Sequence, residues 1–207
     1  MIRRVLIVLF TALLSLSLAQ EEVIIPADST VKETLLKIDD IAPSWALMYA
    51  PAKFEFLKNW TIEKDQRLRR FKTQPDRHVV VMSFFATWCK PCMKELPLLQ
   101  NLYQKYGSEK IKFFLIDITE ATRNSPGFED SPKSGPFLAD KGITIQILND
   151  NRGVVKEKYG VATLPRLFII DKNQTIRLIK QGFHEGEDFE GELSQIFEEL
   201  LAEANEG

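Results

Sequence analysis

Cysteine and histidine are scarce in this chain. Its 207 residues include only two cysteines, Cys89 and Cys92, and two histidines, His78 and His184. A structural zinc site takes four such ligands, so a zinc ion would have to be shared between chains. A c-type haem site requires histidine directly after the second cysteine, and residue 93 is methionine. We therefore expect no haem and no metal, although two thiolates suffice for copper(I), which keeps that alternative open.

An excess of positive charge is also missing. Lysine and arginine number 27 against 29 aspartate and glutamate residues, which gives a formal net charge of −2 at pH 7. The densest basic cluster, residues 67–72, is flanked by acidic residues, as is typical of a solvated helix face. A nucleic-acid surface needs a basic stripe, so we expect no nucleic-acid partner.

Residues 1–19 have the pattern of a secretory signal peptide. Arg3 and Arg4 precede an apolar run that ends at Leu18, and Ser17 and Ala19 place small residues where a signal peptidase reads them. The alternative is an uncleaved membrane anchor, but the run of 14 apolar residues spans about 21 Å, short of the ~30 Å hydrocarbon core. We predict cleavage after Ala19 and export, to the periplasm or beyond.

Export implies an oxidising compartment, in which small domains use disulfides as staples. A bridge between Cys89 and Cys92 closes so short a loop that it constrains the unfolded chain very little. A purely structural role for the cysteine pair is therefore poorly motivated.

The residues around the cysteines predict a β-α-β unit. The apolar run 78–85 is typical of a strand covered on both faces, and residues 111–118 form a second such run. Between them, residues 91–106 show helical periodicity, with a kink expected at Pro97. The cysteines thus lie where the first strand passes into the helix.

The other elements are predicted from periodicity and turn residues. Residues 120–135 are rich in Ser, Pro, Gly and charge, and form either a recognition loop or a tolerated surface insertion. We expect a short helix at 137–141, a strand at 143–148, a helix at 154–159, a hairpin of strands 167–170 and 175–180, and a closing helix at 188–204. Residues 20–77 are the least legible: we expect a strand or turn at 41–45 and one or two helices within 54–71.

The spacing of the cysteines suits redox exchange. Residues at i and i+3 of a helical turn have Cα atoms about 5–6 Å apart, within disulfide range. Cys89 at the helix start would have its thiolate stabilised by the helix dipole and by Lys90, which makes it the attacking sulfur. Cys92, one turn inward and less exposed, would resolve the mixed disulfide, and Pro91 stiffens the turn between them.

A family resemblance supports this interpretation. The motif Trp88-Cys89-Lys90-Pro91-Cys92, Pro97, Thr163-Leu164-Pro165 and the run 137–171 together resemble the TlpA/ResA-like thiol-disulfide oxidoreductases over about residues 79–181. The resemblance implies an α/β thioredoxin fold, with a central mixed sheet flanked by helices, at 78–207. Residues 20–77 would then be an N-terminal extension packed on this core.

The resemblance also implies roles for individual residues. Leu164-Pro165 would be a cis peptide facing the disulfide, with the backbone of Leu164 free to pair with a substrate strand. Arg166 departs from the small hydroxyl residue usual after this proline, which affects substrate preference. Independently of the resemblance, we expect Trp88 to pack over the active site and restrict solvent, with an ordinary half-buried tryptophan as the alternative.

Glu95 matches the acidic residue that the family carries beside its active site. Cytosolic thioredoxins instead carry a buried aspartate at the position of Ser83. Our hypothesis is that Glu95 accepts or relays the proton of Cys92, with which it shares a helix face. The alternative is a surface carboxylate paired with a lysine.

These features predict an exported protein-disulfide oxidoreductase with no cofactor beyond its own Cys89-Cys92 disulfide. The resemblance implies a reductant of disulfide-bearing exported proteins, with cytochrome c maturation as one role, recharged by a membrane-bound thiol electron donor. Two alternatives stay open: an oxidant or isomerase on the same fold, and a copper(I)-handling module.

Overall fold

The computed structural model describes residues 35–63, 77–107 and 110–203. The chain divides into two units, Met1–Lys32 and Glu33–Gly207, and all described residues belong to the second unit. The predicted signal peptide and the basic cluster at 67–72 lie outside the described residues. Among the helices of the described ranges, none has the length and apolar character needed to span a bilayer.

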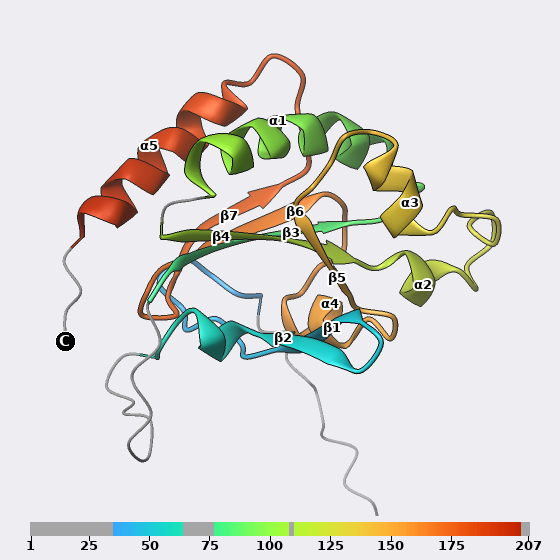
Figure 1. The fold of residues 1–207 in the computed structure, drawn as a ribbon, viewed down its shortest axis with the longest axis horizontal. Coiled ribbons are helices and arrows are strands. Elements are labelled where there is room, and N and C mark those ends of the chain that lie inside the picture. Colours follow the sequence, from blue (N-terminus) through green and yellow to red (C-terminus); the bar gives the residue numbers. More distant parts are fainter. Residues whose placement is uncertain (1–34, 64–76, 108–109, 204–207) are drawn as a thin grey trace, which may run out of the picture. The chain divides into compact units, whose positions relative to one another are not determined.

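A seven-stranded mixed sheet forms the centre, with the strand order β2-β1-β5-β4-β3-β6-β7 (Figure 1). The central strand β3 (Val79–Phe85) pairs in parallel with β4 (Ile111–Asp117) and antiparallel with β6 (Arg166–Ile170). All seven residues of β3 are buried, which explains the continuous apolar run in its sequence. Strands β5 (Gln146–Asn149) and β7 (Ile176–Gln181) extend the sheet on either side.

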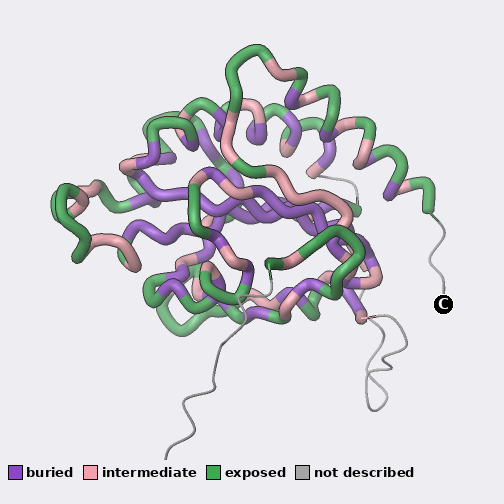
Figure 2. Tube along the Cα trace, turned by 180° about the vertical axis from the view of Figure 1, so that it is seen from behind, coloured by how far each residue is buried: buried purple, intermediate pink, exposed green. Residues whose placement is uncertain are grey.

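Helices cover both faces of the sheet. Helices α1 (Lys90–Tyr106) and α5 (Phe189–Ala202) lie against each other over one face, where the rings of Tyr106 and Phe197 meet at 5.3 Å (Figure 1). The opposite face carries α4 (Val154–Lys158), and Tyr159 directly after it packs against Phe84 of β3 at 5.8 Å. Figure 2 shows the buried residues concentrated along the strands between these layers. The thioredoxin-type α/β architecture expected from the sequence is confirmed.

The described part of the N-terminal segment adds two strands to the sheet. β1 (Ala46–Ala50) and β2 (Lys53–Phe56) form an antiparallel hairpin that joins β5 through Met48 and Asn149. Trp45 is buried against the core: its ring meets Phe114 at 5.7 Å, and its indole N–H donates to the sulfur of Met82.

The helices predicted within 54–71 are wrong where the structure describes them. Residues up to Phe56 belong to β2, and a single 3-10 turn, η1 (Leu57–Asn59), follows it. The carboxylate of Glu55 accepts hydrogen bonds from the side chains of Asn59 and Trp60, which favours a tight turn over a helix. Strand β2 spans only four residues. Its alternation of apolar and polar residues is therefore too short to be recognised beside the helix-like apolar spacing of the residues that follow.

The segment predicted as a loop at 120–135 contains helical structure. It begins inside α2 (Thr119–Thr122) and ends inside α3 (Ser134–Ala139). The strand expected at 143–148 begins only at Gln146. The backbone N–H and the hydroxyl of Thr144 are instead hydrogen-bonded to the side-chain amide of Gln100 on α1. The hairpin of β6 and β7 and the closing helix are confirmed with shifts of one or two residues.

Candidate active site

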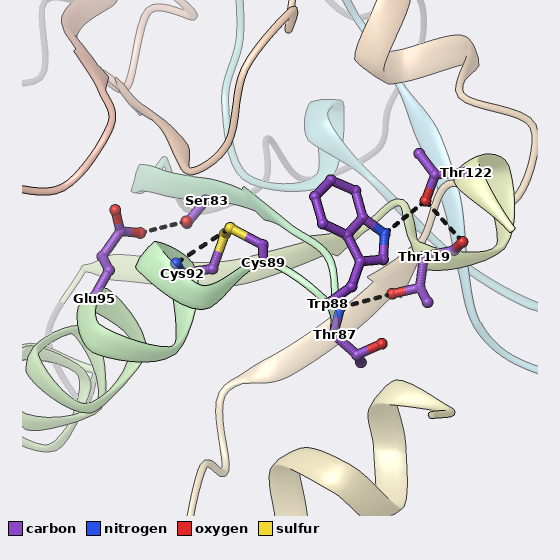
Figure 3. Close-up of a disulfide and its surroundings, with 8 residues drawn as sticks. All are labelled: Ser83, Thr87, Trp88, Cys89, Cys92, Glu95, Thr119 and Thr122. Atoms are coloured by element: carbon purple, nitrogen blue, oxygen red, sulfur yellow. Dashed lines mark hydrogen bonds between the residues drawn. A yellow bond between two sulfur atoms is a disulfide. The ribbon is translucent and has the colours of Figure 1, made fainter. Parts of the chain in front are cut away.

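The two cysteines form a disulfide at the junction of β3 and α1 (Figure 3). Cys89 is the N-cap of α1, and its sulfur accepts a hydrogen bond from the backbone N–H of Cys92 at 3.2 Å. The Cα atoms lie 5.3 Å apart. Both sequence predictions, a cysteine at the helix start and a pair within disulfide range, are confirmed.

Access to the two sulfur atoms differs. Cys89 is 3% exposed and Cys92 is 1% exposed, so the expected difference in exposure is present but small. Cys89 lines a pocket of about 560 Å³ together with Trp88, Lys90 and Pro91, whereas Cys92 does not line it. A partner can therefore approach the disulfide through the pocket only at Cys89.

Trp88 is fixed from two sides. Its indole N–H donates to the hydroxyl of Thr122 at 2.9 Å, and its ring stacks on Phe128 with a centroid distance of 4.0 Å and an interplanar angle of 13°. The preceding residue, Thr87, donates its backbone N–H to Thr119 and its hydroxyl to the carbonyl of Pro132. The connection between β4 and α3 thus holds the loop that carries the cysteines.

Phe128, Thr119 and Thr122 were not predicted as site residues from the sequence. The one available signal was a single phenylalanine within a segment rich in Ser, Pro, Gly and charged residues. The hydroxyl contacts of the two threonines carry no local sequence pattern, because their partners lie 32 and 34 residues away.

The segment 161–164 forms the other side of the pocket. The Leu164-Pro165 peptide is cis, as the resemblance implied. Leu164 is half-buried and lines the pocket with Cys89, about 75 positions earlier in the chain. Within the described ranges, the backbone N–H and C=O of Leu164 have no hydrogen-bond partner. These groups can therefore pair with an extended segment of another chain.

Arg166 begins β6 but does not line the pocket. Its guanidinium group is hydrogen-bonded to the side chain of Gln181 and lies 5.7 Å from the ring centroid of Phe168. The Nε atom is buried and lacks a hydrogen-bond partner among the described residues. Arg166 is thus close to the cis proline in sequence but turned toward β7.

Glu95 is buried behind the disulfide. Only 1% of the residue is exposed, and its Oε1 atom accepts a hydrogen bond of 2.6 Å from the hydroxyl of Ser83. Its Oε2 atom has no partner among the described residues. Figure 3 shows Glu95 and Trp88 on opposite sides of the cysteine pair. The alternative of a surface carboxylate paired with a lysine is therefore wrong.

Burial raises the pKa of Glu95 to about 7, even though the Ser83 hydrogen bond lowers it. The charge of Glu187 raises this pKa further, and that of Lys180 lowers it. A carboxyl group with a pKa near neutrality can exist in either protonation state under ordinary conditions, which suits a group that accepts and returns a proton.

Neither His78 nor His184 lines the pocket beside Cys89. The ring of His78 packs edge-on against Trp60 at 5.1 Å. No group of three or more His, Cys, Asp or Glu side chains within residues 35–63, 77–107 and 110–203 is placed to hold a metal ion.

The chain is similar in sequence and in fold to known thiol-disulfide oxidoreductases. The model of the AhpC/TSA family matches residues 39–179. Thiol-disulfide oxidoreductase ResA of Geobacillus thermodenitrificans is 32% identical over 117 residues, which cover 56% of this chain and 62% of the relative. Sporulation thiol-disulfide oxidoreductase A of Bacillus subtilis is 28% identical over 102 residues, which cover 49% of this chain and 58% of the relative. The match thus spans about 60% of the length of these relatives.

Solved structures share the fold. The thioredoxin domain of a thiol-disulfide oxidoreductase from Bacteroides vulgatus aligns with a TM-score of 0.55 and 14% identity, over 78% of this chain and 99% of that one. The exposed lipoprotein thioredoxin of Streptococcus pneumoniae aligns with a TM-score of 0.52 and 21% identity, over 76% of this chain and all of that one. The resemblance inferred from the sequence motifs is confirmed.

Proposed function

Because this chain belongs to the AhpC/TSA family, and because relatives of similar sequence are named thiol-disulfide oxidoreductases, we propose that it exchanges the Cys89-Cys92 disulfide with disulfides in other proteins. The observation that carries the proposal is the asymmetry of the pair. Cys89 caps α1 and lines the pocket, while Cys92 and Glu95 lie buried behind it.

In the reducing direction the reaction has two steps. The Cys89 thiolate attacks one sulfur of a client disulfide, which forms a mixed disulfide and releases the other client sulfur as a thiolate that takes up a proton. The Cys92 thiolate then attacks Cys89, which forms the intramolecular disulfide and releases the second client thiol. The client gains two electrons and two protons, and the protein dithiol loses them.

Each cysteine receives support from a different part of the fold. The backbone N–H of Cys92, in the first turn of α1, donates to the Cys89 sulfur and with the helix dipole stabilises its thiolate, and Lys90 adds positive charge beside it. Cys92 is surrounded by apolar core, which disfavours its thiolate. Glu95, one helical turn further on, is the base that takes the proton of Cys92 when this thiol must become nucleophilic.

The signal-peptide pattern of residues 1–19 supports an exported setting for this reaction. The protein acts after export, in the periplasm or an equivalent compartment, and needs no cofactor beyond its own disulfide. Its clients are disulfide-bearing exported proteins, and the first class to test is cytochrome c precursors, whose haem-binding cysteines must be thiols. A membrane-bound thiol donor returns the pair to the dithiol state, because such a compartment lacks a cytosolic thiol pool.

The reduction potential of Cys89-Cys92 tests the proposal and its direction. Protein residues 20–207 would be equilibrated with dithiothreitol or glutathione buffers, and the free thiols would be counted by alkylation and mass spectrometry. A value near −270 mV, as in thioredoxin, is expected for a reductant, whereas a value near about −120 mV would make the protein an oxidant. A pair that never forms a disulfide in these buffers would overturn thiol-disulfide exchange and favour copper(I) binding by the two thiolates.

A further inference from the structure

The pocket beside Cys89 is apolar in its depth and charged only at its edge. Its volume of about 560 Å³ is within the range of sites that bind small ligands or side chains. Ile118 and Val161 line it and are buried. The charged lining residues are Lys90, which is exposed, and Lys156, which is partly exposed.

A stacked aromatic pair forms one wall of the pocket. Trp88 and Phe128 both line it, and their rings lie nearly parallel at a centroid distance of 4.0 Å. Phe128 is contributed by the connection between β4 and α3, and its flanks are well anchored. Its own carbonyl accepts the hydroxyl of Ser131 at 2.7 Å, and the carbonyl of Glu129 accepts Arg123 at 2.7 Å.

This anchoring has an energetic consequence. A wall that is ordered before the partner arrives costs little conformational entropy when the partner binds. Aromatic rings also offer a large apolar contact area and favour a further ring at their face or edge. The pocket is therefore prepared for an apolar occupant, with aromatic side chains the best match.

The exchange reaction determines which part of the client lies in the pocket. A client sulfur that exchanges with Cys89 must come within bonding distance of it, and Cys89 is itself part of the lining. The residue next to the client cysteine then enters the same pocket. The free backbone groups of Leu164 are positioned to hold that client segment in an extended conformation.

Building on the proposed function, we propose that this pocket binds an apolar side chain adjacent to the client's reactive cysteine, and that Phe128 sets this preference. The client is a polypeptide with an extended, apolar segment around its disulfide. Acidic residues further along the segment are favoured by Lys90 and Lys156 at the pocket edge.

The test compares two peptide disulfides that differ in one residue. Each is a symmetrical dimer of a short peptide joined through its single cysteine, with either Phe or Ser directly before that cysteine. The reduced protein is mixed with each dimer, the reaction is quenched with acid, and the released peptide thiol is separated by chromatography. For the unmodified chain we expect a second-order rate constant about tenfold higher for the Phe peptide.

The ratio of the two rate constants is the readout, because a general loss of activity or folding in a variant cancels from it. Phe128→Ala is expected to bring the ratio near one, and Phe128→Leu, which keeps apolar bulk, to retain most of it. The matched control is Phe137→Ala, since Phe137 on α3 is half-buried like Phe128 but does not line the pocket. It should leave the ratio unchanged.

Two results would overturn the inference while leaving the proposed function intact. One is a ratio near one in the unmodified chain that exchanges with both peptides. The other is a ratio that Phe128→Ala leaves unchanged. A reduced chain that exchanges with neither peptide would overturn the proposed function itself, and the inference with it.

Discussion

The hydroxyl of Ser83 on β3 donates a hydrogen bond of 2.6 Å to the carboxyl group of Glu95 on α1, and both residues are 1% exposed. The bond joins the strand before the cysteine motif to the helix after it. The carboxyl group of Glu95 thus lies behind the disulfide, next to a position of β3 that carries only the hydroxyl of Ser83. The helix thus supplies a buried carboxyl group that the strand does not carry.

Substituting Glu95 with Gln should alter the pH dependence of disulfide exchange. In the unmodified chain the resolving step should speed up as pH rises through about 7, because Glu95 becomes a carboxylate that can accept the Cys92 proton. Glu95→Gln should lose this inflection and be slower at pH 8 by about 10²-fold. Rates of single-turnover reduction of a disulfide-linked peptide, from pH 5 to pH 9, measure the effect.

Two companion variants sharpen this test. Ser83→Ala removes a hydrogen bond that lowers the pKa of Glu95, so its inflection should move to higher pH. Glu157→Gln changes an exposed glutamate on α4 and should leave the profile unaltered. A Glu95→Gln profile that superimposes on that of the unmodified chain would rule out proton transfer through Glu95.

Glu95 should also make folding stability depend on pH. The unfolded chain releases this proton near pH 4.5, whereas the folded chain keeps it until about pH 7. Between these values the folded state binds more protons, so the free energy of unfolding should fall as pH rises and level off above pH 7. For a group so deeply buried the difference corresponds to about 3 kcal/mol.

Urea denaturation at pH 5 and pH 8 measures this contribution. Because other groups also titrate, the informative quantity is the change between the two pH values in the unmodified chain minus that in Glu95→Gln, with the disulfide kept oxidised in both. The unmodified chain should lose more stability than the variant. Equal losses would mean that the carboxyl group of Glu95 is not desolvated in the folded protein.

The sequence anticipated those parts of the site that depend on local spacing. Two cysteines at i and i+3, a proline between them and an apolar run before them suffice to predict a disulfide at a strand-helix junction. The burial of Glu95 was not predictable in this way, since the same i+3 spacing fits a surface position equally well. Only the packing of α1 against β3 decides between the two, through the contact with Ser83.

The N-terminal hairpin and the wall of the pocket were missed for related reasons. The strand β2 spans only four residues, Lys53–Phe56, too few for an alternating pattern to stand out. Phe128 stacks on Trp88, which lies 40 positions earlier in the chain, and the residues around Phe128 contain no pattern that predicts this contact. Long-range contacts of this kind depend on the whole topology.

Single cysteine variants should separate the roles of the two sulfurs. Cys92→Ser retains the attacking thiol but cannot resolve the mixed disulfide, so it should accumulate a covalent adduct with a disulfide-linked peptide. Cys89→Ser should form little adduct, because Cys92 is 1% exposed and does not line the pocket. Intact-protein mass spectrometry before and after reduction measures both. Equal adduct formation by the two variants would contradict the assignment of Cys89 as the attacking residue.

Thr119 should stabilise the loop that presents the cysteines. Its hydroxyl accepts the backbone N–H of Thr87 at 3.1 Å and donates to the carboxylate of Asp117 at 2.5 Å, and all three residues are buried. Thr119→Val keeps the shape of the side chain but leaves the N–H of Thr87 without its acceptor. Loss of a buried hydrogen bond of this kind should lower the free energy of unfolding by about 1–3 kcal/mol.

The control for this prediction is Thr175→Val, because the hydroxyl of Thr175 has no hydrogen-bond partner among the described residues. Urea denaturation should show a clear loss of unfolding free energy for Thr119→Val and little change for the control.

A second measurement, the rate of disulfide exchange, separates the position of the cysteine loop from global stability. If Thr119 holds the cysteine loop in place, Thr119→Val should also slow exchange under conditions where the variant is fully folded, since Thr87 lies only two residues before Cys89. A variant that is destabilised but exchanges at the normal rate would confine Thr119 to a purely structural role.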